Sequence, residues 1–325
     1  MPTFFLPPDF DFMPLGGAAL LGTYISTMLY GFTTFQTYRY YQLSWTTDTM
    51  FLKLYVFIIW ILETLHTALS IAFTFRFAIV NYGNLAAFEV TKPSDDAVTF
   101  STAVISFLVH LFYCRRLWIL SNNSFVLVGV VLILSFANFG MELATGALTF
   151  VHPKLSDFHL ITPYYTGSLS LAAAVDIIIA ASLSYLLYRH RGMMESTNTI
   201  ITKITAYAIT TGALTTVTNI IILICFVTMP DNLWYLCFYS FIPNLYTNSF
   251  LAMLNSRAGL RAETKHVFTS TGVGSDSMHF ARRTGISSGT VRVGVDVDVD
   301  SASDYAKFGR GQKDASRDDI EMRDV

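Results

Sequence analysis

Residues 125–148 read FVLVGVVLILSFANFGMELATGAL, a run of 24 residues that contains a single charged side chain, Glu142. A helix crosses the hydrocarbon core of a bilayer with about 20 apolar residues, so this run is long enough to span a membrane. The whole chain has a similar character, because 53% of its 325 residues are hydrophobic, 14% are charged and the mean hydropathy is +0.48. Soluble domains rarely have this composition. The sequence therefore predicts an integral membrane protein.

Comparable apolar runs recur along the chain and set its organisation. The predicted spans are 15–37, 51–74, 98–119, 125–150, 164–188, 204–228 and 234–255. They predict an all-α fold, a seven-transmembrane-helix bundle over residues 15–256. A short extracellular N-terminus, residues 1–14, precedes the bundle. Residues 257–325 are rich in Gly, Ser, Thr and charges of both signs, so we expect a disordered cytoplasmic tail.

The distribution of Lys and Arg predicts the orientation of the bundle. Basic residues accumulate in cytoplasmic connectors. The first, third and fifth connectors are the basic ones, through Arg39, Arg115, Arg116, Arg189, Arg191 and Lys203. We therefore place the N-terminus outside and the C-terminus inside. The sequon Asn122-Asn123-Ser124 then lies in a cytoplasmic connector, where it should stay unglycosylated.

Ionisable and amide side chains inside the predicted spans are the candidate functional residues. An unpaired charge at mid-bilayer costs about 2.5–3.5 kcal/mol, so such residues are expected to face the bundle interior. Two interpretations stay open, hydrogen bonding that fixes helix packing and a site for a ligand, ion or proton. Besides Glu142, the candidate intramembrane polar site consists of Glu63, His66, His110, Asn138, Asp176, Asn219, Asn244 and Asn248.

Helical spacing predicts how two groups of these residues are oriented. Asn244, Asn248 and Asn255 lie within about 40° of one another on a helix, so they form one stripe facing the interior. Asp176 lies on a face of small residues that includes Ala180, and such a face allows another helix to approach closely.

Six segments spread over roughly residues 15–260 together resemble a known family. They are GAALLGTYISTMLYG (17–31), LKLYVFIIWILETLHT (52–67), CRRLWILS (114–121), AAAVDIIIAASLSYLLYRHRG (172–192), TTGALTT (210–216) and YTNSFLAMLNSR (246–257). Their order and spacing resemble the fungal multi-pass membrane proteins of the domain of unknown function 6534. The resemblance implies a seven-helix fungal membrane protein, and it brings no reaction, ligand or catalytic residue with it.

The arrangement favours a receptor-like or sensor protein. Seven spans, an outside N-terminus and basic inner connectors suit a ligand that enters from outside, although this rests on analogy between folds. A proton-coupled transporter or channel is the alternative, in which Glu63, His66 and Asp176 would couple a solute to protons. No internal repeat of the kind usual in transporters is visible in the sequence. A structural membrane scaffold is a further alternative.

Enzymatic chemistry is disfavoured because few ligating residues lie inside the spans. Only His66 and His110 do so, whereas zinc hydrolases need several ligands. Glu63 and His66 form one Glu-x-x-His pair, while di-iron bundles use two. The last span contains no Lys that could bind retinal as a Schiff base. We therefore expect no enzyme activity, no cofactor and no metal.

The expected partners follow from this class of protein. The bilayer is the first, with the plasma membrane favoured over internal membranes. A small or lipidic ligand would enter between the helices, because no ordered extracellular domain is predicted. The tail could bind a cytoplasmic partner, and no nucleic acid is expected.

Overall fold

The computed structural model describes residues 16–81, 90–122, 124–189, 195–229 and 232–271. These residues form helices joined by short connectors, with one isolated antiparallel bridge between Val90 and Lys154 and no strand among them. The prediction of an all-α fold is confirmed for this part of the chain. The helices are α1 (Ala18–Ser44), α2 (Met50–Phe75), α3 (Pro93–Leu120), α4 (Phe125–Val151), α5 (Phe158–Arg189), α6 (Glu195–Thr228), α7 (Trp234–Tyr239) and α8 (Ile242–Thr271). A π-helical turn, η2 (Arg76–Val80), extends α2, and a 3-10 turn, η4 (Leu155–Asp157), precedes α5.

Four of the helical segments are long and apolar enough to cross a membrane, judged by length and composition over the described residues. They are Met50–Val80, Pro93–Leu120, Phe125–Val151 and Phe158–Leu186. A shorter apolar stretch, Gly212–Thr228, lies in α6. The chain is therefore an integral membrane protein. The other predicted spans fall on α1, α6 and α8. The described apolar part of α6 is short, and α1 and α8 are less apolar, so the count of seven spans stays a prediction.

The last predicted span, 234–255, is divided between two helices. α7 ends at Tyr239 and α8 begins at Ile242, so that Pro243 lies in the first turn of α8. Proline is tolerated there because the first amides of a helix have no intrahelical acceptor. α8 continues to Thr271, so residues 257–271, which we assigned to the tail, are helical. Residues 272–325 of the predicted tail and the predicted N-terminal segment 1–14 lie outside the described residues.

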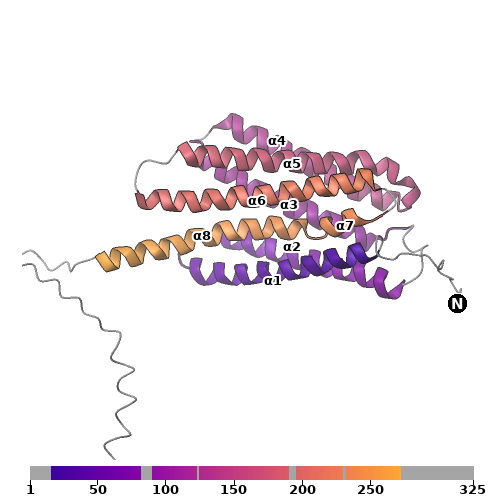
Figure 1. Cartoon of the computed structure of the whole chain (residues 1–325), viewed down its shortest axis with the longest axis horizontal. Helices are drawn as coiled ribbons and strands as arrows, with labels where there is room; N and C mark the ends of the chain where they lie inside the picture. Colours follow the sequence, from indigo (N-terminus) through magenta and orange to yellow (C-terminus); the bar gives the residue numbers. More distant parts are fainter. Residues whose placement is uncertain (1–15, 82–89, 123, 190–194, 230–231, 272–325) are drawn as a thin grey trace, which may run out of the picture. The chain divides into compact units, whose positions relative to one another are not determined.

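Consecutive helices lie side by side from α1 to α6, and α8 lies between α6 and α1 (Figure 1). α3 contacts α2, α4, α5 and α8, and α8 also contacts α2, so these two helices form the interior of the bundle. The main apolar core gathers here, with Val109 and Phe112 of α3 in one cluster with Phe250 and Leu254 of α8. In the apolar window of α3, 56% of the residues are buried, against 22% in α4.

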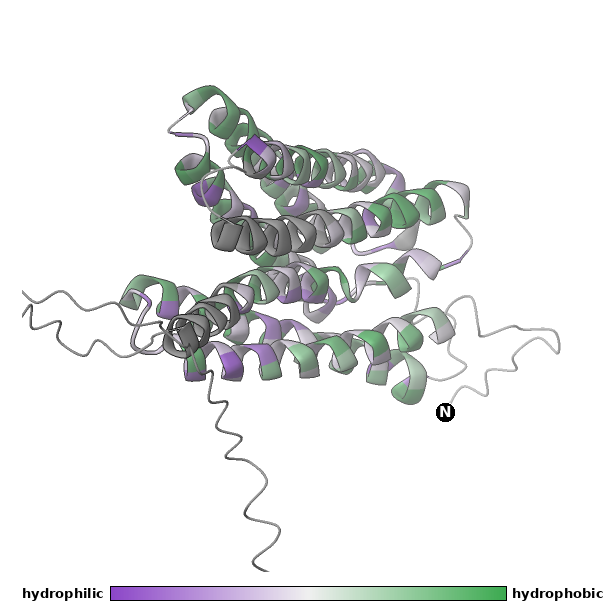
Figure 2. Ribbon diagram, turned by 60° about the vertical axis from the view of Figure 1, so that its left-hand side comes forward, coloured by the Kyte–Doolittle hydropathy of each residue, from purple (hydrophilic) through white to green (hydrophobic). Residues whose placement is uncertain are grey.

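The outer surface of the bundle is apolar and part of its interior is polar, as expected where lipid replaces water. α1 shows the pattern most clearly, because its buried side carries Thr23, Ser26 and Thr33. Its exposed side carries large apolar residues, among them Met28 and Phe32. Hydrophobic residues accordingly cover much of the helix ribbons (Figure 2).

Candidate functional site

Glu63 of α2 is fully buried and lies at the centre of a network that joins α2 to α8 and α1. Its Oε2 accepts a hydrogen bond from Thr247 Oγ1 at 2.9 Å, and its Oε1 accepts one from Asn244 Nδ2. Asn244 Oδ1 in turn accepts a hydrogen bond from Ser26 Oγ at 2.6 Å. Both carboxylate oxygens therefore have donors, which offsets part of the cost of burying this side chain.

The predicted asparagine stripe of α8 faces the bundle interior, and it packs against α1. Asn248 Nδ2 donates to the backbone oxygen of Leu29 at 3.1 Å, and Gln36 Nε2 donates to Asn248 Oδ1 at 3.0 Å. About two helical turns further, Asn255 Nδ2 donates to the backbone oxygen of Gln36 at 2.9 Å. The stripe thus joins two helices through side-chain and backbone hydrogen bonds.

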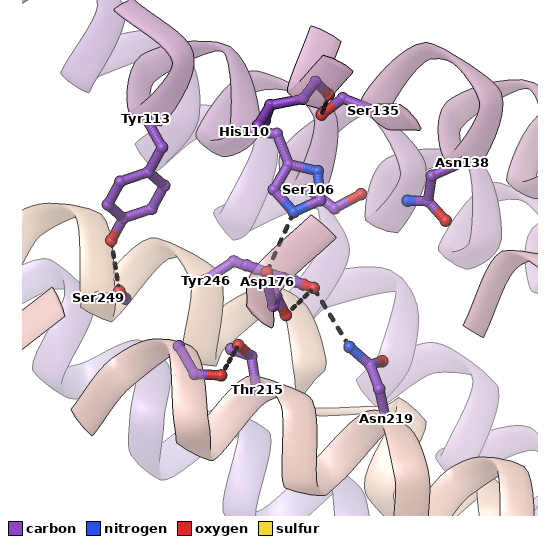
Figure 3. A network of polar contacts seen from close by, with 12 residues as sticks. Ser106, His110, Tyr113, Ser135, Asn138, Asp176, Thr215, Asn219, Tyr246 and Ser249 are labelled. Carbon is purple, nitrogen blue, oxygen red and sulfur yellow. Dashed lines mark hydrogen bonds and ion pairs between the residues drawn. The ribbon is translucent and has the colours of Figure 1, made fainter. Parts of the chain in front are cut away.

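A second network joins α3, α5, α6 and α8 around Asp176 (Figure 3). Asp176 Oδ2 accepts a hydrogen bond from the Tyr246 hydroxyl at 2.9 Å, and its Oδ1 lies 3.3 Å from His110 Nε2. Asn219 Nδ2 donates to the same hydroxyl at 3.3 Å. The His110 and Tyr246 rings meet edge to face, with centroids 5.4 Å apart. Four helices are therefore joined through one carboxylate and one phenol.

The small-residue face beside Asp176 does allow a close helix approach, as predicted. A methyl group added at Gly212 of α6 would lie 2.9 Å from the Ala180 Cβ and 3.6 Å from the backbone oxygen of Asp176. Such contacts leave no room for a larger residue at position 212, so glycine sets the distance between α5 and α6 at this depth.

A third, smaller group joins α3 and α4. Glu142 is half-buried, its Oε2 accepts a hydrogen bond from Ser106 Oγ at 3.1 Å, and Asn138 Nδ2 lies 3.4 Å from its Oε1. The predicted polar residues are thus distributed over three groups. Glu63 lies with Asn244 and Asn248, and Asp176 with His110 and Asn219, while Asn138 lies with Glu142. Whether any of them is functional stays a prediction.

His66 is the predicted site residue that joins none of these groups. It is fully buried, and neither ring nitrogen has a hydrogen-bond partner among the described residues. Thr67 and Ser70 lie on the same face of α2, and their hydroxyl groups are also buried without a partner in this part of the chain. Because helical residues three, four and seven apart share a face, a polar stripe runs from Glu63 to Ser70.

Ser70 borders a cavity of about 150 Å³ at the end of the bundle where α1 begins. Its walls come from α1 through α7, and most of its surface is apolar. None of the eight predicted site residues lines it. Pockets between helices of a bundle are frequent ligand sites, so this cavity is the second candidate region of the molecule.

Aromatic residues form one wall of the cavity around Tyr165 of α5. The Tyr165 ring centroid lies 4.6 Å from that of Phe226, 5.9 Å from that of Tyr235 and 5.8 Å from that of Tyr239. Tyr165 is only 6% exposed, and its hydroxyl has no hydrogen-bond partner among the described residues. The cavity therefore contains a buried phenol whose hydrogen-bonding capacity is unused within this part of the chain.

Two aspartates at the start of α3 form the acidic side of the cavity. α3 begins at Pro93, and the backbone amide of Lys92 donates to Asp95 Oδ2 at 3.0 Å. Asp95 also pairs with Arg76, so its charge is compensated. Asp96 is 4% exposed and lines the same cavity. Its carboxylate makes no hydrogen bond or ion pair with any residue that the structure describes.

Sequence reasoning did not find the cavity residues. Asp95 and Asp96 lie between the second and third predicted spans, in a connector that the predicted orientation places outside. The segment Pro93-Ser94-Asp95-Asp96 carries the usual signal of a helix start, with proline followed by acidic residues. That signal could have placed Asp96 in a first helical turn. It could not have shown that the carboxylate lacks a partner, because this depends on the positions of α2, α5 and α7.

The fold and its buried polar groups define a helical multi-pass membrane protein. Residues 172–259, which extend from α5 into α8, match the model of the family of unknown function DUF6534. The predicted resemblance is supported over this range, while its extension to residues 15–171 and the fungal origin stay predictions. No curated protein and no solved structure gives a significant match to the chain.

Proposed function

We propose that this protein is a seven-span, receptor-like sensor in which a small ligand binds the cavity and changes the packing of the bundle. The observation that carries the proposal is the cavity itself, which contacts α1 through α7 and contains buried polar groups that have no partner among the described residues. A buried polar group without a partner is costly, so ligand contact at Ser70 and Tyr165 would be favourable.

Burial patterns support the spans that composition alone leaves undecided. α1 buries small and hydroxyl-bearing residues and exposes large apolar ones, which suits a helix with lipid on its outer side. α8 is less apolar because it lies in the interior and contacts α1, α2, α3 and α6. Asn244 and Thr247 hydrogen-bond to α2, Asn248 to α1 and Ser249 to α3. These features favour seven spans. The cavity lies at the end where α1 begins, so an outside N-terminus would place it on the extracellular side, and we propose the plasma membrane as the location.

The connection from α7 to α8 offers a route from the cavity to the rest of the bundle. Tyr235 and Tyr239 of α7 line the cavity, and α8 begins three residues after Tyr239. α8 then supplies the donors to Glu63 and the hydroxyl that joins Asp176 to Asn219. A ligand that displaces α7 would therefore also move α8, and through it the networks around Glu63 and Asp176. Signalling requires an element of this kind, which can adopt two arrangements.

A proton-coupled transporter is the second candidate, and one observation favours it. The α2 stripe from Ser70 through His66 to Glu63 leads from the cavity into the bundle. The Ser70 hydroxyl and the His66 ring have no partner among the residues that the structure describes, so they could hold water or a proton. Receptor and transporter differ in whether anything crosses the membrane.

The test uses the full-length protein in liposomes and in nanodiscs. In liposomes, a sensor gives no proton or solute flux above that of empty vesicles under an imposed pH gradient. Flux that disappears in His66→Ala or Asp176→Asn, and persists in the control Gly31→Ala, would favour the transporter over the sensor. Gly31 is a suitable control because an added methyl group there would contact nothing within 4 Å.

In nanodiscs, hydrogen exchange is followed while a panel of small aromatic amines, alcohols and carboxylates is added. A sensor should show altered exchange around residues 232–241, at the cavity, and also around 118–124, at the other end of α3. Changes limited to the cavity, or no change with any compound, would contradict the proposal. The cavity-filling variant Thr149→Trp should remove both changes, because Thr149 lines the cavity.

A further inference from the structure

We propose that the cavity binds a small organic cation, an amine or quaternary ammonium carried on an apolar group no larger than about one aromatic ring. This inference rests on the proposed ligand-binding function of the cavity, and it adds the chemical class of the ligand. The carboxylate of Asp96 is the residue that would pair with the positive charge.

Charge pairing around the cavity leaves one carboxylate uncompensated. Arg76 pairs with Asp95, donates to Ser94 Oγ at 3.2 Å and packs over the Phe77 ring, with its guanidinium carbon 4.7 Å from the centroid. That cation is therefore fully engaged. Asp96, the next residue of α3, is only 4% exposed. No cation and no hydrogen-bond donor of the described residues contacts its carboxylate. Burying a lone carboxylate is expensive, so a ligand that brings a positive charge gains affinity by pairing with it.

The aromatic wall favours an organic cation over an anion. Phe226, Tyr235, Tyr239 and Tyr165 present π-systems to the cavity, and aromatic faces attract alkylammonium groups. The two buried hydroxyls of Ser70 and Tyr165 have no partner in the described structure, and their oxygens can accept hydrogen bonds from an ammonium N–H. A carboxylate or phosphate ligand would instead meet the charge of Asp96.

The size of the cavity and the side chains that line it restrict the chemical class of the ligand further. A volume of about 150 Å³ accommodates a benzene-sized group. A calcium ion takes six to eight oxygen ligands, as a rule including several carboxylates. Among the described residues, no group of three metal-ligating side chains occurs. Mostly apolar walls and the Asp96 carboxylate, which has no partner among the described residues, match an amine better than a hydrated metal ion.

The experiment compares three ligands that share one ring and differ in charge. Benzylamine, benzyl alcohol and benzoate are titrated against the full-length protein in nanodiscs, with empty nanodiscs subtracted to remove partition into lipid. We expect saturable binding of benzylamine, at least about tenfold weaker binding of benzyl alcohol and none of benzoate.

Two variants of equal charge test the role of Asp96. Asp96→Asn should weaken benzylamine binding by about tenfold or more and leave benzyl alcohol unchanged. Asp157→Asn is the matched control, because Asp157 lies in η4 and does not line the cavity, and it should leave all three affinities as they are. Tyr165→Phe keeps the ring and removes the hydroxyl, so a smaller loss is expected. The ligand series with the natural sequence decides the question even if Asp96→Asn does not fold.

The outcomes separate this inference from the proposed function. If benzyl alcohol and benzylamine bind equally well and Thr149→Trp abolishes both, the ligand need not be a cation. The cavity would then remain the ligand site, and only the inferred ligand class would be contradicted. Binding that Thr149→Trp leaves intact would place the ligand elsewhere and overturn both proposals. If benzylamine shows no saturable binding at millimolar concentration, the inference that the cavity binds an organic cation is contradicted directly.

Discussion

Glu63 and Asp96 are both buried carboxylates, yet their surroundings differ. Those of Glu63 suit a structural role, and those of Asp96 suit ligand binding. Glu63 is fully buried, and each of its oxygens accepts a hydrogen bond from α8. Asp96 is 4% exposed, lines a cavity and has no partner among the described residues. The first carboxylate is occupied by the chain's own donors, and the second is available to a molecule from outside.

The comparison changes how intramembrane charge is interpreted. Burying an ionisable residue inside the membrane costs free energy. Only its hydrogen-bond partners show whether the chain itself already offsets that cost. Glu63 and Asp176 have donors from other helices and therefore determine how α8 is placed. At the cavity end, the hydroxyls of Ser70 and Tyr165 and the Asp96 carboxylate have no partner among the described residues, so ligand contact would be most favourable there.

The largest predicted effect is at Asn244, which connects Glu63 to α1. Asn244→Ala removes a donor to the carboxylate and the acceptor of Ser26 Oγ, so the free energy of unfolding should fall by about 3 kcal/mol. Asn255→Ala is the matched control on the same helix, because it removes a single bond to a backbone oxygen and should cost about 1 kcal/mol. Unfolding in mixed micelles measures both. Equal losses would show that Glu63 does not depend on Asn244.

The second effect concerns the contact between α1 and α7, which supports the cavity. A methyl group at Gly22 would lie 2.7 Å from the Cα of Cys237, so α7 must move away in Gly22→Ala. We expect a loss of about 2 kcal/mol and weaker ligand binding. Gly31→Ala, in the same helix but with nothing within 4 Å, should be neutral or slightly stabilising. If Gly22→Ala matches this control, the close approach of α1 and α7 does not support the cavity.

Much of the fold could be predicted from the sequence, because apolar length and helical period are local properties. The run beginning at Phe125 predicted α4 to within about one residue at its C-terminal end, Val151. The division between α7 and α8 was not predicted. Pro243 lies in the first turn of α8, so it does not mark the break itself. The break at Ser240 and Phe241 depends on packing of α7 against α1 and α6.

The polar interior was only partly predictable. Helical spacing correctly placed Asn244, Asn248 and Asn255 on one inward face, since the angle between residues follows from the sequence. Which residue meets which across the bundle depends on helix rotation and depth, so the three separate groups could not be foreseen. The cavity residues were missed because they lie near the ends of the spans, where charge and aromatic residues usually indicate the membrane interface.

The smallest predicted effect is an absence of change, and it tests on which side the cavity lies. With the N-terminus outside, the sequon Asn122-Asn123-Ser124 between α3 and α4 is cytoplasmic and carries no glycan. Endoglycosidase treatment should leave the mobility of the protein on a gel unchanged, as should Ser124→Ala. A shift in the natural sequence that Ser124→Ala removes would invert the orientation and place the cavity on the cytoplasmic side.

The difference between the two carboxylates is tested most directly by replacing each with its amide and measuring unfolding without ligand. Glu63→Gln puts an amide NH₂ against donors of α8 and should lower the free energy of unfolding by about 2 kcal/mol. Asp96→Asn removes a buried charge that has no partner in the described part of the chain, so it should leave the free energy of unfolding unchanged or raise it by about 1 kcal/mol. A loss at Asp96 equal to that at Glu63 would show that the chain itself supplies a partner to Asp96, and would contradict its role as a ligand-binding carboxylate.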